Sequence, residues 1–178
     1  MSAAEYAIGA DIGGTKIAFA LVDRAGRALD THQLPTNAAA GPDAVVEAVA
    51  AGVRLLHGRA PGAIAGIGVG VPGSVDSERG IARDAVNLGW KEMPLASRLE
   101  AATGLPARVQ NDVNAILNGE LRFGSARGCR TVALAAIGTG IGGAFAVDGK
   151  IVDGATGSAG GIGHTAIMSP RRQCRCGL

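Results

Sequence analysis

A short polar segment between two apolar runs, residues 11–16 (DIGGTK), has the residue types that bind phosphate. A glycine turn exposes backbone N–H groups, and a threonine hydroxyl and a lysine ammonium add donors for phosphate oxygens. The residues expected to make these contacts are Gly13, Gly14, Thr15 and Lys16, and Asp11 is placed to hold Mg²⁺ through water. The spacing is not that of a P-loop, G-x-x-x-x-G-K-[ST]. Taken alone, the segment fits an ordinary hairpin with a solvated lysine equally well.

A second glycine turn, residues 137–143 (IGTGIGG), repeats this arrangement in the later part of the chain. It contains a G-x-G-x-x-G-like run, but no helix is expected after it, so a dinucleotide-binding Rossmann site is not expected. The strand after each turn carries the same three residues, AFA, and an acidic turn follows. Two copies of one pattern predict two related lobes whose glycine turns face one cleft and clamp a triphosphate. In the second turn the expected phosphate-binding residues are Gly138, Thr139, Gly140 and Gly142.

Residues 111–114 (NDVN) lie where a strand is expected to meet a helix. Aspartate at such a junction is commonly a helix N-cap. A carboxylate there could also accept the proton of an attacking hydroxyl during phosphoryl transfer. Without the glycine turns, the N-cap interpretation of Asp112 is favoured. With them, its role as general base becomes the leading hypothesis.

Near the end of the chain, His164 is followed by Cys174 and Cys176 in a C-x-C pair. A lone histidine is usually structural, but imidazole and two thiolates suit tetrahedral Zn²⁺. We therefore expect these three residues to form part of a zinc site, and nothing identifies Cys129 as the fourth ligand. Three cysteines are an odd number that does not fit a disulfide framework.

Alternating strands and helices are expected to position these segments, which predicts an α/β fold. The expected strands are 6–11, 16–23, 28–34, 64–71, 107–110, 131–137 and 144–147, and the expected helices are 42–57, 94–103 and 112–122. We expect a first lobe at 1–125 and the start of a second at 126–178. The second has only its opening hairpin and a glycine-rich tail, so we expect it to be incomplete and marginal alone.

The composition narrows the class of function. The chain has 178 residues, is 47% apolar and 18% charged, and carries a net charge of +2 with scattered basic residues. This charge is too small for a nucleic-acid footprint, and 3% aromatic residues offer few stacking surfaces for single strands. No secretion signal or membrane span is expected, which makes the cytoplasm the default location.

Taken together in their order along the chain, the motifs resemble those of the ROK family (repressor, open reading frame, kinase), especially its bacterial glucokinase-like members. The segments that carry the resemblance are 11–16 (DIGGTK), 70–73 (GVPG), 87–90 (NLGW), 111–114 (NDVN), 138–140 (GTG), 163–164 (GH) and 174–177 (CRCG). The resemblance implies an actin-like ATPase (ribonuclease H-like) fold with duplicated lobes. It also implies transfer of the γ-phosphate of ATP to the 6-hydroxyl of a hexose, with Asp112 as general base. The residues that it implies for sugar binding are Pro72, Gly73, Asn87, Asn111, Asp112 and His164. It implies structural zinc at His164, Cys174 and Cys176, and it leaves a homodimer open.

The sequence departs from the family pattern at two places. Gly161 stands where family kinases often carry a sugar-binding glutamate, so glucose leads but N-acetylmannosamine or another hexosamine stays open. Family members also continue well beyond Leu178, which indicates a truncated chain that lacks a third zinc cysteine and part of the adenine pocket. A sugar-sensing regulator without turnover is the alternative from another class. Direct DNA binding is not expected, because the first strand begins near Tyr6 and leaves no room for a preceding DNA-binding segment.

Overall fold

The largest element is a mixed five-stranded sheet, seen in a computed structural model that describes residues 5–138 and 140–165. Its strand order is β3-β2-β1-β4-β8. The strands are β1 (Tyr6–Ile12), β2 (Lys16–Asp23), β3 (Ala28–Pro35), β4 (Ile64–Val71) and β8 (Ala107–Asn111). Strands β1 to β3 form an antiparallel meander, whereas β4 pairs parallel with both β1 and β8. The carboxyl ends of β1, β4 and β8 therefore meet at one edge, where open α/β sheets usually bind ligands.

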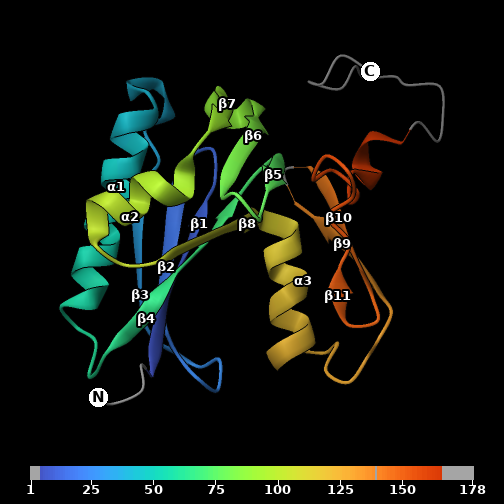
Figure 1. The fold of residues 1–178 in the computed structure, drawn as a ribbon, viewed down its shortest axis with the longest axis horizontal. Coiled ribbons are helices and arrows are strands. Elements are labelled where there is room, and N and C mark those ends of the chain that lie inside the picture. The colour runs from blue at the N-terminus through green and yellow to red at the C-terminus, as the bar shows by residue number, and fades with distance from the viewer. Residues whose placement is uncertain (1–4, 139, 166–178) are drawn as a thin grey trace.

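Two helices cover this sheet and create the main hydrophobic core. Helix α1 (Pro42–His57) packs against β1, β2 and β3, and α2 (Leu95–Thr103) packs against α1 and β8. The apolar positions of α1 recur at helical spacing, as predicted, and those that are buried include Val45, Val49, Val53 and Leu56. Figure 1 shows α1 and α2 together beside the sheet, with α3 (Asp112–Phe123) lying away from them.

A small antiparallel sheet between β4 and α2 is absent from the sequence-based prediction. It consists of β5 (Ser74–Asp76), β6 (Ile81–Ala85) and β7 (Trp90–Met93) in the order β5-β6-β7. Its strands have only three to five residues and are separated by turns at Gly80 and Gly89, both with positive φ. Strands this short contain too few residues to show a clear alternation of apolar and polar side chains, which is the pattern that identifies a strand in a sequence. Two short 3-10 helices, η1 (Ala38–Ala40) and η2 (Val86–Leu88), were missed in the same way.

The later part of the chain forms a third sheet, with the order β11-β10-β9. Its strands are β9 (Val132–Ile137), β10 (Ile141–Val147) and β11 (Lys150–Ile151), and the 3-10 helix η3 (Ile162–His164) follows. Asp148 and Gly149 both have positive φ, 51° and 74°, as a tight two-residue turn with the twist of a hairpin requires. Strand β10 begins three residues earlier than predicted, so Gly142 lies within a strand and pairs with Ala136. We refer to this sheet and residues 152–165 as the C-terminal unit.

Helix α3 joins the two larger sheets. It contacts β4 and β8 on one side and β10 and β11 on the other, and Figure 1 shows it between them. Its fully buried Leu117 packs with Ala144 and Ala146 of β10 in a small second core. The two larger sheets lie on either side of the predicted boundary near residue 125, a division into domains that stays a prediction. No helix among the described residues has the length and apolar character needed to cross a membrane.

Candidate active site

A cleft of about 620 Å³ opens where the carboxyl ends of β1, β4 and β8 meet the C-terminal unit. Its walls come from segments that lie far apart in the sequence. Among the residues predicted for the site, those lining the cleft are Gly13, Gly14, Pro72, Gly73, Asn87, Asn111, Asp112, Gly138, Gly140, Gly142 and His164. The structure thus brings glycines of both turns to one cavity together with the predicted base.

Asp112 begins α3 and is half-buried. The N-cap of this helix is Asn111, whose Oδ1 accepts hydrogen bonds of 3.0 Å from the backbone N–H groups of Val113 and Asn114. The Asp112 side chain is therefore not required as the cap, which was the alternative to its role as a base. Asn111 Nδ2 donates to Asp112 Oδ1 at 2.9 Å and to the carbonyl of Gly73 at 3.0 Å.

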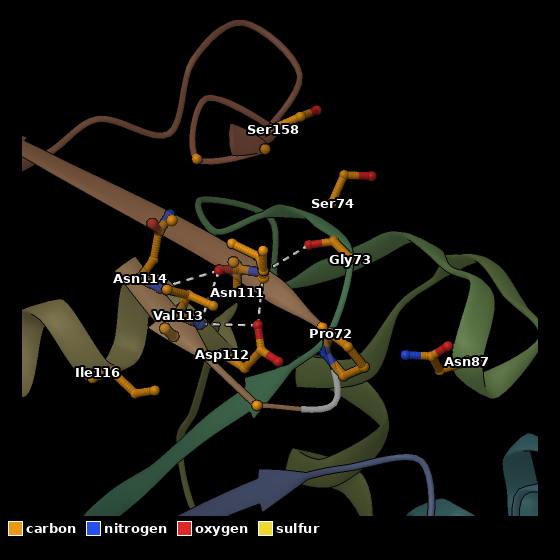
Figure 2. Close-up of a pocket in the computed structure, with 18 of the residues that line it drawn as sticks. Pro72, Gly73, Ser74, Asn87, Asn111, Asp112, Val113, Asn114, Ile116 and Ser158 are labelled. Carbon is orange, nitrogen blue, oxygen red and sulfur yellow. Dashed lines mark hydrogen bonds between the residues drawn. The ribbon is translucent and has the colours of Figure 1, made fainter. Parts of the chain in front are cut away.

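One carboxylate oxygen of Asp112 is held in place, and the other points into the cleft. Oδ1 accepts hydrogen bonds from Val113 N–H and Asn111 Nδ2, both 2.9 Å long. Figure 2 shows the second oxygen directed toward Pro72. The hydrogen bonds that Asn111 and Val113 donate both go to Oδ1, so the second oxygen is available to accept a proton from a ligand.

Burial raises the pKa of Asp112 above its usual value, as the largest of the effects acting on it. The hydrogen bond from Val113 N–H lowers this pKa, and the nearby negative charge of Asp11 raises it again. A carboxylate with a raised pKa is a stronger proton acceptor as long as it is ionised, a property common among catalytic carboxylates.

Asp11 lies beside Asp112 because of the parallel register of β1, β4 and β8. Asp11 of β1 pairs with Gly70 of β4, and Gly70 pairs in turn with Gln110 of β8. Asp112 follows Gln110 by two residues. A Cβ atom at Gly70 would lie 3.3 Å from Asp11 Oδ1 and 3.5 Å from Asp112 Cα, so the glycine allows both acidic residues to approach. Partial burial raises the pKa of Asp11, and the positive charge of Lys16 opposes this shift.

Three predicted phosphate-site residues lie outside the lining of the cleft. Thr15 and Lys16 are exposed, and Asp11 keeps an exposed surface although its carboxylate is partly buried. All three border the first glycine turn without lining the cavity. Gly13 N–H closes this turn by donating to the carbonyl of Lys16 at 2.9 Å. The turn is therefore formed by the chain's own hydrogen bond.

The wall opposite Asp112 belongs to the C-terminal unit and consists mainly of small residues. Gly157, Ser158, Gly160, Gly161 and His164 line the cleft there. A Cβ atom at Gly160 would lie 1.8 Å from the carbonyl oxygen of Gly143, so only glycine fits at this position. At Gly161, by contrast, φ is −69° and the nearest contact of a Cβ atom would be 3.4 Å, an ordinary distance. The backbone would accept a side chain at position 161, and glycine leaves that space open beside His164.

Several lining residues were missed by the sequence analysis. Ser74, Ile116 and Ser158 line the cleft but belong to no motif, so the sequence carried no signal for them. Ile137 and Ile141 belong to the second glycine segment, 137–143, but only glycines and Thr139 of that segment were assigned to the site. They add an apolar surface to the otherwise polar and glycine-rich wall.

Three predicted site residues, Thr139, Cys174 and Cys176, lie outside the described residues. The zinc site therefore stays a prediction, with His164, exposed at the cleft, as its one described ligand. Within residues 5–138 and 140–165, no group of three or more His, Cys, Asp and Glu side chains is placed to hold a metal ion.

Comparison with known proteins gives a consistent result. The sequence profile of the ROK family matches residues 7–178. The chain is 39% identical over 173 residues to a glucokinase of Streptomyces coelicolor, covering 96% of this chain and 52% of that protein. It is 37% identical over 169 residues to an N-acetylmannosamine kinase of Salmonella typhimurium, covering 94% of this chain and 56% of that protein.

A solved structure shares the fold. The ROK family glucokinase of Streptomyces griseus, in complex with glucose and AMPPNP, superposes with a TM-score of 0.84 at 36% identity. The superposition covers 92% of this chain and 51% of that one, and this chain spans about half the length of the curated relatives it matches. The fold is thus the expected actin-like ATPase architecture with an incomplete second lobe, and the chain belongs to the ROK family.

Proposed function

We propose that this chain forms the sugar-binding and base-carrying part of an ATP-dependent hexose kinase. The proposal rests above all on Asp112, whose carboxylate has one oxygen fixed by hydrogen bonds and the other directed into a cleft lined by two glycine turns. An anchored base beside donors for phosphate is what transfer to a hydroxyl requires. The similarity to sugar kinases of one family supports the same function.

In the proposed reaction, the hexose lies among Pro72, Gly73, Asn87, Asn111 and His164 with its 6-hydroxyl at Asp112. As the 6-oxygen bonds to the γ-phosphorus, its proton passes to the free oxygen of Asp112. The bond from the γ-phosphorus to the bridging oxygen breaks, and ADP leaves. Positioning and a general base are the main contributions of the protein, because phosphoryl transfer needs little covalent help.

The two glycine turns are proposed to hold the nucleotide's phosphates between them. Gly13 and Gly14 of the first turn and Gly138, Gly140 and Gly142 of the second all line the same cleft, which supports this proposal. Thr15, Lys16 and Thr139 complete the proposed set of donors. When bound, Mg²⁺ would neutralise charge on the phosphoryl oxygens, and the carboxylate of Asp11 would hold it through water, which leaves the free oxygen of Asp112 for the hydroxyl proton.

Glucose is the proposed substrate because a glucokinase is among the most similar relatives and a structural relative is bound to glucose. N-acetylmannosamine is the second candidate, and two observations favour it. A kinase for this sugar is 37% identical to the chain, and the open space at Gly161 lies beside His164 in the proposed sugar site. This space could admit a substituent larger than a hydroxyl.

The test is ADP release over a panel of hexoses and hexosamines. It compares the wild type with Asp112→Asn, in the 178-residue chain and in any longer product of the same reading frame. Loss of the base should lower kcat by roughly 10²–10⁴-fold. Equal turnover of the two proteins would refute Asp112 as the base. Sugar binding by calorimetry without ATP hydrolysis in any wild-type product would favour a sugar-sensing regulator instead.

We also propose that His164, Cys174 and Cys176 bind zinc, which would fix His164 at the sugar site. Measuring the zinc content of the purified wild type and of Cys174→Ser and Cys176→Ser tests this proposal without an activity assay. Each substitution should lower the zinc content, since thiolates are the strong ligands of structural sites. A wild type without zinc would contradict it.

A further inference from the structure

Asp153 follows β11 in the C-terminal unit and does not itself line the cleft. Its half-buried carboxylate accepts three hydrogen bonds from residues of the N-terminal part. Gln110 Nε2 and Asn114 Nδ2 donate to Oδ1 at 3.2 and 2.8 Å, and Ser77 Oγ donates to Oδ2 at 2.9 Å. One side chain thus joins the end of β8, the first turn of α3 and the segment after β5.

The contact with Gln110 leads directly to the proposed base. While its Nε2 donates to Asp153, its Oε1 accepts a hydrogen bond of 2.8 Å from Asn111 N–H. The side chain of Asn111 in turn holds Asp112 Oδ1. Two residues therefore separate Asp153 from the base, and each link is a hydrogen bond of ordinary length.

The contact with Asn114 is a second connection between Asp153 and the first turn of α3, which carries Asp112. Asn114 is 5% exposed, and a buried amide without a partner carries a free-energy cost of about 1–3 kcal/mol. Its Nδ2 donates a hydrogen bond to Asp153 Oδ1, and its backbone N–H donates one to Asn111 Oδ1, the helix cap. Asp153 thus supports the first turn of α3 through a side chain, in addition to the N-cap that bonds its backbone.

The backbone of Asp153 serves the other wall of the cleft. Its carbonyl accepts a hydrogen bond of 3.1 Å from Ala159 N–H and closes the loop that contains Gly157 and Ser158. These two residues line the cleft opposite Asp112, and Gly160, Gly161 and His164 follow directly. Asp153 is therefore bonded both to the segment carrying the base and to the segment forming the facing wall.

We propose that Asp153 is a positioning residue that fixes the distance between the base and the facing sugar-binding wall. This inference rests on the proposed function, because it assigns Asp153 to the same reaction. The role depends on hydrogen bonding rather than on charge. An asparagine could keep Oδ1 on Gln110 and Asn114 and donate through Nδ2 to Ser77 Oγ, because a hydroxyl both donates and accepts.

The kinetic test compares Asp153→Ala with Asp153→Asn. Misplacing reacting groups by about 1 Å costs on the order of 10²-fold in rate. Asp153→Ala should therefore lower kcat per folded molecule roughly 10–100-fold and raise the KM for the hexose, whereas Asp153→Asn should keep most of both. Asp148→Asn is the matched control, because it removes an aspartate charge from the exposed turn of the same sheet, where the partner is Arg130. It should leave both constants unchanged.

A second readout does not depend on turnover. Hydrogen exchange of the backbone amides of Val113, Asn114 and Ala159 should become faster in Asp153→Ala and stay near wild type in Asp153→Asn. If the wild type shows no kinase activity, the proposed function fails while this exchange pattern still tests Asp153. If Asp153→Ala does not fold, Gln110→Ala takes its place, because Gln110 is the link between Asp153 and Asn111. A folded Asp153→Ala with wild-type kcat, KM and exchange overturns the inference, as does equal damage in the alanine and asparagine variants.

Discussion

The two walls of the cleft differ in what they contribute and in what supports them. The first wall offers the polar side chains of Asn111 and Asp112, where β8 meets α3, and of Asn87 in η2. It stands on the large core that α1 and α2 form with the five-stranded sheet and with the small sheet β5 to β7. The facing wall offers glycines and a histidine. Behind it, within the described part of the chain, lies a small core in which Leu117, Ala144 and Ala146 are buried and five partly buried side chains pack against them.

This difference separates two tasks within one site. A base must keep its orientation within a fraction of an ångström, which a large core and fixed hydrogen bonds provide. Glycines present backbone groups and leave room for a ligand, which needs close backbone approach rather than side-chain chemistry. We therefore expect substitutions in the first wall to affect kcat, and those in the facing wall to affect mainly KM and the local stability of the C-terminal unit.

The largest expected effect comes from the small core behind the facing wall. Leu117→Ala should lower the free energy of unfolding of the C-terminal unit by about 2–5 kcal/mol, because the residue is fully buried and few neighbours can fill the cavity. Limited proteolysis should then cut the C-terminal unit while the five-stranded sheet resists. Val147→Ala is the control and should have little effect, because Val147 lies at the end of β10 in the C-terminal unit and is 52% exposed. If the protease cut the five-stranded sheet as readily as the C-terminal unit, the two walls would unfold as one cooperative unit.

A somewhat smaller effect is expected in the first wall. Asn111→Ala removes the cap of α3 and one of the two donors that hold Asp112, so kcat should fall by roughly 10²-fold. Loss of the cap should also destabilise the protein by about 0.5–2 kcal/mol, measured by urea unfolding. Asn118→Ala, at an exposed position of the same helix, should change neither quantity. A lower stability with an unchanged kcat would show that Asp112 does not need Asn111.

The facing wall offers a matched pair of glycines. Gly160→Ala would place a methyl group 1.8 Å from the carbonyl oxygen of Gly143, so the segment that lines the cleft must move. The KM for the hexose should rise about tenfold, which corresponds to about 1.4 kcal/mol of lost binding, with a smaller change in kcat. Gly161→Ala meets only contacts of 3.4 Å or longer and should leave the fold intact. If both variants bind the sugar as the wild type does, the segment is not part of the sugar site.

The same contrast explains how much could be predicted from the sequence. The strands of the five-stranded sheet and helix α1 were predicted to within one or two residues, because long apolar patterns and Gly58 after the helix mark them clearly. In the first wall, Asn111 and Asp112 were found through a motif at the junction of a strand and a helix, whereas Asn87 was found only through the family resemblance. Asp153 was missed because an Asp-Gly pair before a glycine-rich segment has the pattern of a plain turn. Its partners, Gln110, Asn114 and Ser77, lie 39 to 76 residues away, and the three short strands β5 to β7 that place Ser77 gave no signal.

The smallest expected effect is on the free energy of unfolding, which the buried carboxylate of Asp112 should lower slightly. Because the pKa of Asp112 is raised in the folded protein, the folded state holds more protons than the unfolded state between the two pKa values. Stability therefore decreases as the pH rises through this window, and the cost is fully present at neutral pH. Asp112→Asn should then be slightly more stable than the wild type in urea at pH 7, and this advantage should shrink as the pH falls toward the ordinary carboxyl range. Such a gain in stability with a loss of turnover is typical of a residue kept for chemistry rather than for folding. A lower stability of Asp112→Asn at pH 7 would mean that the hydrogen bonds to its carboxylate outweigh its burial, and that Asp112 serves the fold as Asn111 does.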